Sequence, residues 1–201
     1  MPWVVWLIFG LCLLPEVYLS GADFRLWGSP LTRDLAFDHF AFWAGTSSDS
    51  FPYYRAQPYL MFLTYGFLHG GLVHFGVNML TLFSLGKPIA RALGSWRFLV
   101  LYVVVLVAGG LGFAALPVID VPMVGASGAL FGLVGVLLAW EVQRRRARGL
   151  SLRPVANNVA ILVGLNAVLW WVMNGQLAWQ THLGGFLAGW AIAEWLLPLR
   201  R

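Results

Sequence analysis

Two stretches decide the fold of this chain: Val124-Gly-Ala-Ser-Gly-Ala-Leu-Phe-Gly132 and Thr181-His-Leu-Gly-Gly-Phe-Leu-Ala-Gly189. Each lies in a long apolar run, and each contains two glycines four residues apart. This spacing lets the backbones of two membrane helices approach closely. We therefore expect two apolar helices packed face to face, and their contact would bring Ser127 and His182 together.

Around these stretches the composition is that of a membrane protein. Of the 201 residues, 60% are hydrophobic and 10% are charged, whereas an ordinary soluble domain has about 25% charged residues. A helix needs about 20 apolar residues to cross a hydrocarbon core about 30 Å thick. The six predicted spans are 3–20, 71–89, 98–116, 123–140, 155–173 and 177–197. We predict an all-α, polytopic membrane protein with one domain, residues 1–201.

The first apolar run has an alternative interpretation as a signal peptide. Ser20-Gly-Ala22 is small enough for cleavage, but the run lacks a basic n-region and has Pro15-Glu16 near its end. We favour a retained helix. Its Cys12 is the only cysteine, so it can form no intramolecular disulfide and is expected to act as a small apolar residue.

The basic residues follow the turns between spans. Ten of the 13 lie between spans two and three, between spans four and five, or at the C-terminus. Because basic loops stay in the cytoplasm, we expect both termini there. The short tails and the absence of a transit-peptide composition make a bacterial inner membrane the expected location. No single basic patch forms, which excludes nucleic acid as the expected partner and leaves the lipid bilayer.

The first loop, residues 21–70, is the one long connection. Its aromatic residues are Trp27, Phe37, Phe40, Phe42, Trp43, Phe51, Tyr53, Tyr54 and Tyr59. Aromatic side chains of this kind are typical of the membrane interface. We expect this loop to lie partly in the outer leaflet.

Polar side chains inside a bilayer are costly, so each one is a candidate functional group. The candidates within the predicted spans are His74, Asn78, Ser127 and His182. His74 and Asn78 are four residues apart and therefore share a helical face. Three carboxylates, Glu16, Glu141 and Glu194, lie near predicted helix ends and are expected to reach water.

These polar groups share one depth. The separation is 17 residues from His74 to Arg91 and from Ser127 to Arg144, and 18 residues from His182 to Arg200. At about 1.5 Å per helical residue, each group lies about 25 Å above the inner charges, near the outer edge of the core. A common depth indicates one site.

The residue types in this layer predict acyl transfer. A serine needs a base, and an imidazole with a pKa near about 6.5 can take its proton. Ser127 and His182 form this pair. His74, Asn78 and the Ser127 backbone N–H are candidate donors to an oxyanion, each worth about 3 to 4 kcal/mol.

Gly125 and Gly128 allow an extended stretch to lead into the helix and a substrate backbone to approach.

The sequence lacks the residues that other proteolytic mechanisms need. There is no His-Glu-x-x-His zinc motif, the spans hold no aspartate pair, and Lys87 lies on the cytoplasmic side, away from Ser127. Glu194 is about 18 Å from His182 along their helix. We therefore expect a dyad without a carboxylate.

These motifs resemble the rhomboid intramembrane serine proteases, from about Leu63 to Trp190. The segment Leu68-His69-Gly-Gly-Leu-Val-His74-Phe-Gly-Val-Asn78 is similar to the family's His-x-x-x-Asn helix with its preceding histidine. Gly125-Ala-Ser-Gly128 resembles its Gly-x-Ser-Gly motif, and His182 with Gly185-x-x-x-Gly189 resembles its final helix.

The resemblance implies a six-transmembrane-helix rhomboid-like bundle and a Ser127 and His182 dyad that needs neither metal nor cofactor. It also implies an oxyanion site with His74 and Asn78. Substrates would be single-span transmembrane proteins, reaching the site past a mobile fifth helix and cut near the outer face under a loop cap.

The sequence departs from the family's pattern at two places. Phe131 replaces a common tyrosine, so its ring can pack on His182 without a hydroxyl, and a Trp-Arg pair is not evident upstream of His69.

Two alternatives stay open at this point. One is a catalytically silent rhomboid-like protein that binds transmembrane helices. The other is a haem or metal carrier that uses His74 and His182. The sequence does not specify the oligomeric state or the physiological substrate.

Overall fold

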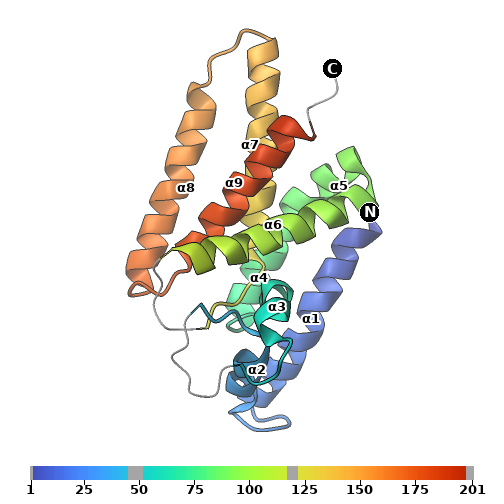
Figure 1. Cartoon of the computed structure of the whole chain (residues 1–201), viewed down its shortest axis with the longest axis vertical. Helices are drawn as coiled ribbons and strands as arrows, with labels where there is room; N and C mark the ends of the chain where they lie inside the picture. The colour runs from blue at the N-terminus through green and yellow to red at the C-terminus, as the bar shows by residue number, and fades with distance from the viewer. Residues whose placement is uncertain (1, 45–51, 117–121, 198–201) are drawn as a thin grey trace.

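The computed structural model describes residues 2–44, 52–116 and 122–197. The long helices are α1 (Trp3–Asp23), α6 (Ser95–Ala115), α7 (Ser127–Ala147), α8 (Arg153–Val172) and α9 (Trp179–Trp195) (Figure 1). A further rod is formed by α4 (Leu72–Thr81), a π-helical turn (Leu82–Gly86) and α5 (Lys87–Leu93). Each of the six predicted spans thus corresponds to a helical segment. The all-α prediction is confirmed, since the described residues hold no strand and only one isolated bridge, between Phe42 and Met123.

Three of these helices are long and apolar enough to cross a membrane by themselves: α1, α6 and α8. A fourth span is added if residues 57–67 and 72–93 are taken together, although the chain bends there by 81°. By contrast, α7 ends in a charged segment and α9 has 17 residues. These two helices are therefore less autonomous and depend on burial within the bundle.

The glycine pairs of α7 and α9 pack against each other, as predicted. A Cβ atom added at Gly185 would overlap the Gly128 carbonyl oxygen, and one at Gly189 would overlap the Gly132 carbonyl oxygen. A third helix, α6, crosses the pair in the same way, because a Cβ at Gly112 would lie 2.6 Å from the Gln180 carbonyl oxygen. The absence of side chains at these positions lets the backbones touch.

One helix, α8, stands to the side of the others in Figure 1. Val155 is its only buried residue, and it packs with Leu138 and Val142 of α7. Most of the large apolar side chains of α8 are exposed. In a bilayer these side chains would be solvated by lipid rather than by the rest of the protein.

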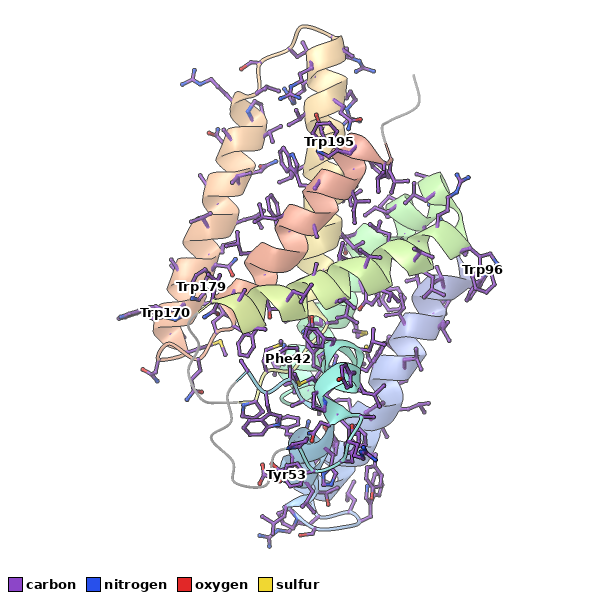
Figure 2. The ribbon with its side chains drawn as sticks, in the orientation of Figure 1. Phe42, Tyr53, Trp96, Trp170, Trp179 and Trp195 are labelled. Carbon is purple, nitrogen blue, oxygen red and sulfur yellow. The ribbon has the colours of Figure 1, made fainter. Side chains whose placement is uncertain are left out.

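The first loop contains α2 (Thr32–Phe40), α3 (Gln57–Thr64) and a 3₁₀ turn, Tyr65–Phe67. It is tied to the bundle through Phe42, which is fully buried and packs edge-on against the rings of Phe62 and Phe113. Figure 2 shows Phe42 beneath α6, while Tyr53 lies near α2 at the far end of the loop. The described parts of the loop, residues 21–44 and 52–70, are thus folded against the bundle.

The prediction that Glu16 reaches water is wrong. Its side chain is 1% exposed, and its two carboxylate oxygens accept hydrogen bonds from the Arg33 guanidinium at 3.1 Å each. Ser20 donates a further hydrogen bond to it at 2.7 Å. The reason is tertiary: α2 folds back over the end of α1 and brings a cation to the carboxylate, and a buried charge is tolerated when it is paired.

The first loop has no evident Trp-Arg pair, and the contacts of Arg33 hold it in place instead. Its guanidinium forms an ion pair with Asp23 at 2.6 Å and donates to the His69 carbonyl oxygen at 2.5 Å. One side chain therefore links α1, α2 and the segment that leads into α4. This network fixes the start of α4 relative to the first loop.

Candidate active site

Ser127 is the first residue of α7, and the segment before it is held in an extended form. Met123 exchanges two backbone hydrogen bonds of 2.9 Å with Phe42, and the Gly125 N–H donates to the Tyr65 carbonyl oxygen at 2.9 Å. Gly125 has a φ of +123°, a conformation that only glycine adopts readily. The chain can therefore turn into α7 at Ser127. The first N–H groups of a helix lack intrahelical acceptors and point toward its N-terminal end.

The structure brings Ser127 and His182 into contact. The distance between Ser127 Oγ and His182 Nε2 is 2.9 Å. His182 lies in the first turn of α9 and is 8% exposed. A Cβ atom at Gly128 would lie 2.5 Å from Thr181 Cγ2, so the glycine lets this first turn approach Ser127.

Two more side chains hold the imidazole of His182. The Phe131 ring, one turn after Ser127, stacks on it with centroids 4.2 Å apart and planes 6° apart. Asn166 Oδ1 lies 2.6 Å from His182 Nδ1. The ring is therefore covered on one face and hydrogen bonded at both nitrogens, and α7, α8 and α9 each contribute.

Sequence reasoning missed Asn166. The predicted site comprised His74, Asn78, Ser127 and His182, and the one carboxylate of the His182 helix, Glu194, is too far along that helix to contact the imidazole. One signal was available: Asn166 is a polar residue between Leu165 and Ala167, inside the fifth predicted span. An amide at that position is expensive unless it has a partner.

His74 and Asn78 lie against the backbone that precedes Ser127. A Cβ atom added at Gly125 would be 2.9 Å from His74 Nε2 and 3.9 Å from Asn78 Nδ2. His74 Nδ1 accepts a hydrogen bond from the Gly70 N–H at 3.2 Å, so in the neutral ring the proton resides on Nε2. Asn78 donates to the His74 carbonyl oxygen at 3.0 Å and is 4% exposed.

His69 lies behind His74. It is fully buried, and its ring packs edge-on against those of His74 and Phe75 at 5.2 and 5.5 Å. Among the described residues neither of its ring nitrogens has a hydrogen-bond partner. Its contacts place it beside the candidate oxyanion donors rather than against Ser127.

A cavity of about 480 Å³ adjoins the imidazole, between α8 and α9. Apolar side chains such as Leu162, Val163 and Phe186 line it, and His182 and Asn166 also border it. Trp170 of α8 and Trp179 at the start of α9 lie at the same end of the helix pair (Figure 2). An apolar segment of a bound molecule can therefore lie next to His182, the candidate base.

Residues 56–199 match the family model of the rhomboid domain. Two similar proteins from Bacillus subtilis are the rhomboid protease GluP, 31% identical over 122 residues, and the putative rhomboid protease YdcA, 31% identical over 126 residues. The matches cover 61% and 63% of this chain, but 23% and 61% of those proteins. Inactive RHOMBOID-like protein 8 of Arabidopsis thaliana is 30% identical over 107 residues, 51% of this chain and 30% of that protein. With its apolar helices and a family match over well more than half of its length, this integral membrane protein belongs to the rhomboid family.

Proposed function

We propose that this protein is an intramembrane serine endopeptidase that cleaves single-span transmembrane proteins with Ser127 as nucleophile and His182 as base. The observation that carries the proposal is the 2.9 Å hydrogen bond between Ser127 Oγ and His182 Nε2. Two parts of the chain 55 residues apart in sequence meet at that bond. A hydroxyl within hydrogen-bond reach of an imidazole is the arrangement that activates a serine.

The reaction follows the pattern of acyl transfer. As Ser127 Oγ attacks the scissile carbonyl carbon, its proton passes to His182 Nε2. The protonated imidazole then gives this proton to the leaving amine, which leaves an acyl group on Ser127. A water molecule next loses a proton to His182 and attacks the acyl carbon, and the proton returns to Ser127 as the acid product departs.

Three groups are suited to stabilise the oxyanion. His74 Nε2–H and the Asn78 amide lie near the backbone before Ser127, and the Ser127 N–H is at the N-terminal end of α7. Donors aimed at a developing charge are worth about 3 to 4 kcal/mol each in a site that excludes water. The helix dipole of α7 acts in the same direction.

The orientation that we propose follows the basic residues. Arg144, Arg145 and Arg146 lie in the last turn of α7, at the opposite end of the helix from Ser127. Basic segments remain in the cytoplasm, so both termini would be cytoplasmic and cleavage would occur near the outer face, in a bacterial inner membrane. A substrate must present an unwound segment there, because a helix keeps its own carbonyl groups hydrogen bonded.

A second candidate is a catalytically silent protein that binds transmembrane helices. It is supported by the similarity to a relative that is named inactive. The two candidates differ in whether Ser127 reacts. A fluorophosphonate probe that labels the wild type but not Ser127→Ala would favour the protease.

The main test is cleavage of a panel of single-span proteins by the purified protein in liposomes. We expect Ser127→Ala and His182→Ala each to lower the cleavage rate by a factor of about 10⁴ or more. Ser84→Ala is the matched control, because Ser84 is exposed on its helix and bonds only its own backbone in the described contacts. Full activity in either dyad variant would refute the proposed mechanism.

A further inference from the structure

The edge of the His182 ring that faces away from Ser127 meets Asn166 of α8 at 2.6 Å. We propose that Asn166 is a positioning residue that fixes the tautomer and orientation of His182, so that alignment of the base depends on the position of α8. The inference rests on the proposed protease function. It extends that function by adding a residue from a helix outside the predicted dyad.

The orientation of the Asn166 amide follows from its two contacts. Asn166 Nδ2 lies 2.9 Å from the Leu162 carbonyl oxygen, one turn earlier on α8. A carbonyl oxygen only accepts, so the amide must present its NH₂ group there. The reversed amide would set two acceptors against each other. Oδ1 therefore faces His182.

The amide orientation in turn fixes the imidazole. Because Asn166 Oδ1 only accepts, His182 Nδ1 must carry the proton and donate it. A neutral imidazole has one N–H, so the lone pair of Nε2 faces Ser127 Oγ at 2.9 Å. This is the tautomer that a general base for serine requires. Without Asn166, both tautomers and a rotated ring become accessible.

An amide also suits the helix that carries it. Most of α8 is exposed, and its outward side chains are apolar. A carboxylate on a helix that faces lipid is costly to place, whereas a neutral amide can accept the Nδ1–H bond at lower cost. The same contact gives orientation without adding a full charge beside the base.

The contact is also one of the few ties between this half of α8 and the bundle. The buried anchor of α8 is Val155, eleven residues before Asn166, or about 16 Å along the helix. Between α8 and α9 lies the cavity of about 480 Å³. Outward movement of this half of α8 would break the 2.6 Å bond while Ser127 and Phe131 stay in place on α7. The imidazole of His182 is thus aligned only while α8 keeps Asn166 in contact with it.

The test compares Asn166→Leu, which keeps the approximate volume but removes the acceptor, with Asn166→Asp, which keeps it. Asn158→Leu is the matched control, because Asn158 is an exposed asparagine on the same helix. We would measure kcat and KM on a single-span substrate, and the rate of fluorophosphonate labelling, across pH. If Asn166→Leu fails to fold, Asn166→Ala takes its place.

We expect Asn166→Leu to lower both kcat and the labelling rate about 10- to 100-fold with little change in KM, as misplacement of a catalytic group does. Asn166→Asp should restore most of the rate and move the acid limb of the pH profile to higher pH, because a carboxylate stabilises the protonated imidazole. His74, a titratable group on α4 that lies beside Gly125, is unchanged in all these variants. Asn158→Leu should behave as the wild type.

Wild-type rates in Asn166→Leu would overturn the inference. So would equal losses in Asn166→Leu and Asn166→Asp with no displacement of the acid limb, since that result means a packing role only. Ser127→Ala belongs in the same series. If it retains activity, the protease function itself fails; if it is inactive while Asn166→Leu is fully active, only the role of Asn166 fails.

Discussion

The two helices that flank the imidazole, α8 and α9, are both apolar but are held in different ways. On α9 the small residues Gly185 and Gly189 face α7, and the two backbones touch. On α8 the buried anchor is Val155, and large side chains such as Leu165 and Trp171 are exposed. Both helices are apolar, so hydropathy alone does not decide how closely a helix packs; small residues at the contact allow the close approach of α9, and a Cβ atom at Gly164 of α8 would meet nothing within 4 Å.

The division also separates two tasks. The nucleophile and base lie on α7 and α9, whose backbone contact fixes the spacing between Ser127 and His182. The group that orients the base lies on the less packed α8. Elements that move in function tend to be those with few buried contacts. Substitutions on the two helices should therefore have unequal effects.

Among substitutions outside the proposed dyad that test packing, the largest effect on stability is expected from Gly189→Ala on α9. The added methyl group would overlap the Gly132 carbonyl oxygen, which belongs to backbone and cannot rotate away. Overpacking commonly destabilises by about 1 to 3 kcal/mol, and a backbone clash belongs at or above the upper end. Thermal unfolding in detergent and cleavage activity should both fall. An unchanged melting temperature would contradict the close contact between α7 and α9.

An intermediate effect is expected from Phe131→Leu, which removes the ring that stacks on His182. An aromatic pair contributes about 0.5 to 1.5 kcal/mol beyond its buried area, so kcat should fall about two- to tenfold. Phe131→Tyr keeps the ring and serves as the control. The measurement is kcat on a single-span substrate. Equal activity in the leucine and tyrosine variants would show that the stack does not position the base.

The smallest effect is expected from Gly164→Ala on α8. A Cβ atom at Gly164 would meet nothing within 4 Å, and alanine favours a helix over glycine by up to about 1 kcal/mol. The melting temperature should stay constant or rise slightly, with normal activity. Gly164→Ala and Gly189→Ala add the same methyl group, so the difference between their effects on stability reports the atoms that surround each glycine. A large loss of stability at Gly164 would mean that α8 is packed more tightly than the structure has it.

Most of the bundle was predictable from local features. Each of the six apolar runs corresponds to a helical segment with bounds within seven residues of the prediction, the largest difference being the end of α7, and the glycine pairs predicted which faces of α7 and α9 meet. The candidate dyad followed from depth, because helical rise converts residue number into distance. The roles of Ser127 and His182 remain predictions until they are tested by substitution.

Other parts required the folded chain. Glu16 was expected in water, yet Arg33 reaches it from a loop helix 17 residues later. Asn166 was passed over because an evenly apolar helix does not reveal which of its sides faces the protein. Loop paths and helix rotation set these two contacts, and neither follows from a local pattern.

By itself the sequence determined that this is an all-α membrane protein and where its helices lie, and it predicted one depth for Ser127, His182 and His74, because hydropathy and helical rise are properties of short segments. Only the tertiary structure decided that Arg33 neutralises Glu16 and that Asn166 meets His182. Those contacts join separate helices, and their geometry depends on how each helix is rotated and seated against its neighbours, which is a property of the packed whole.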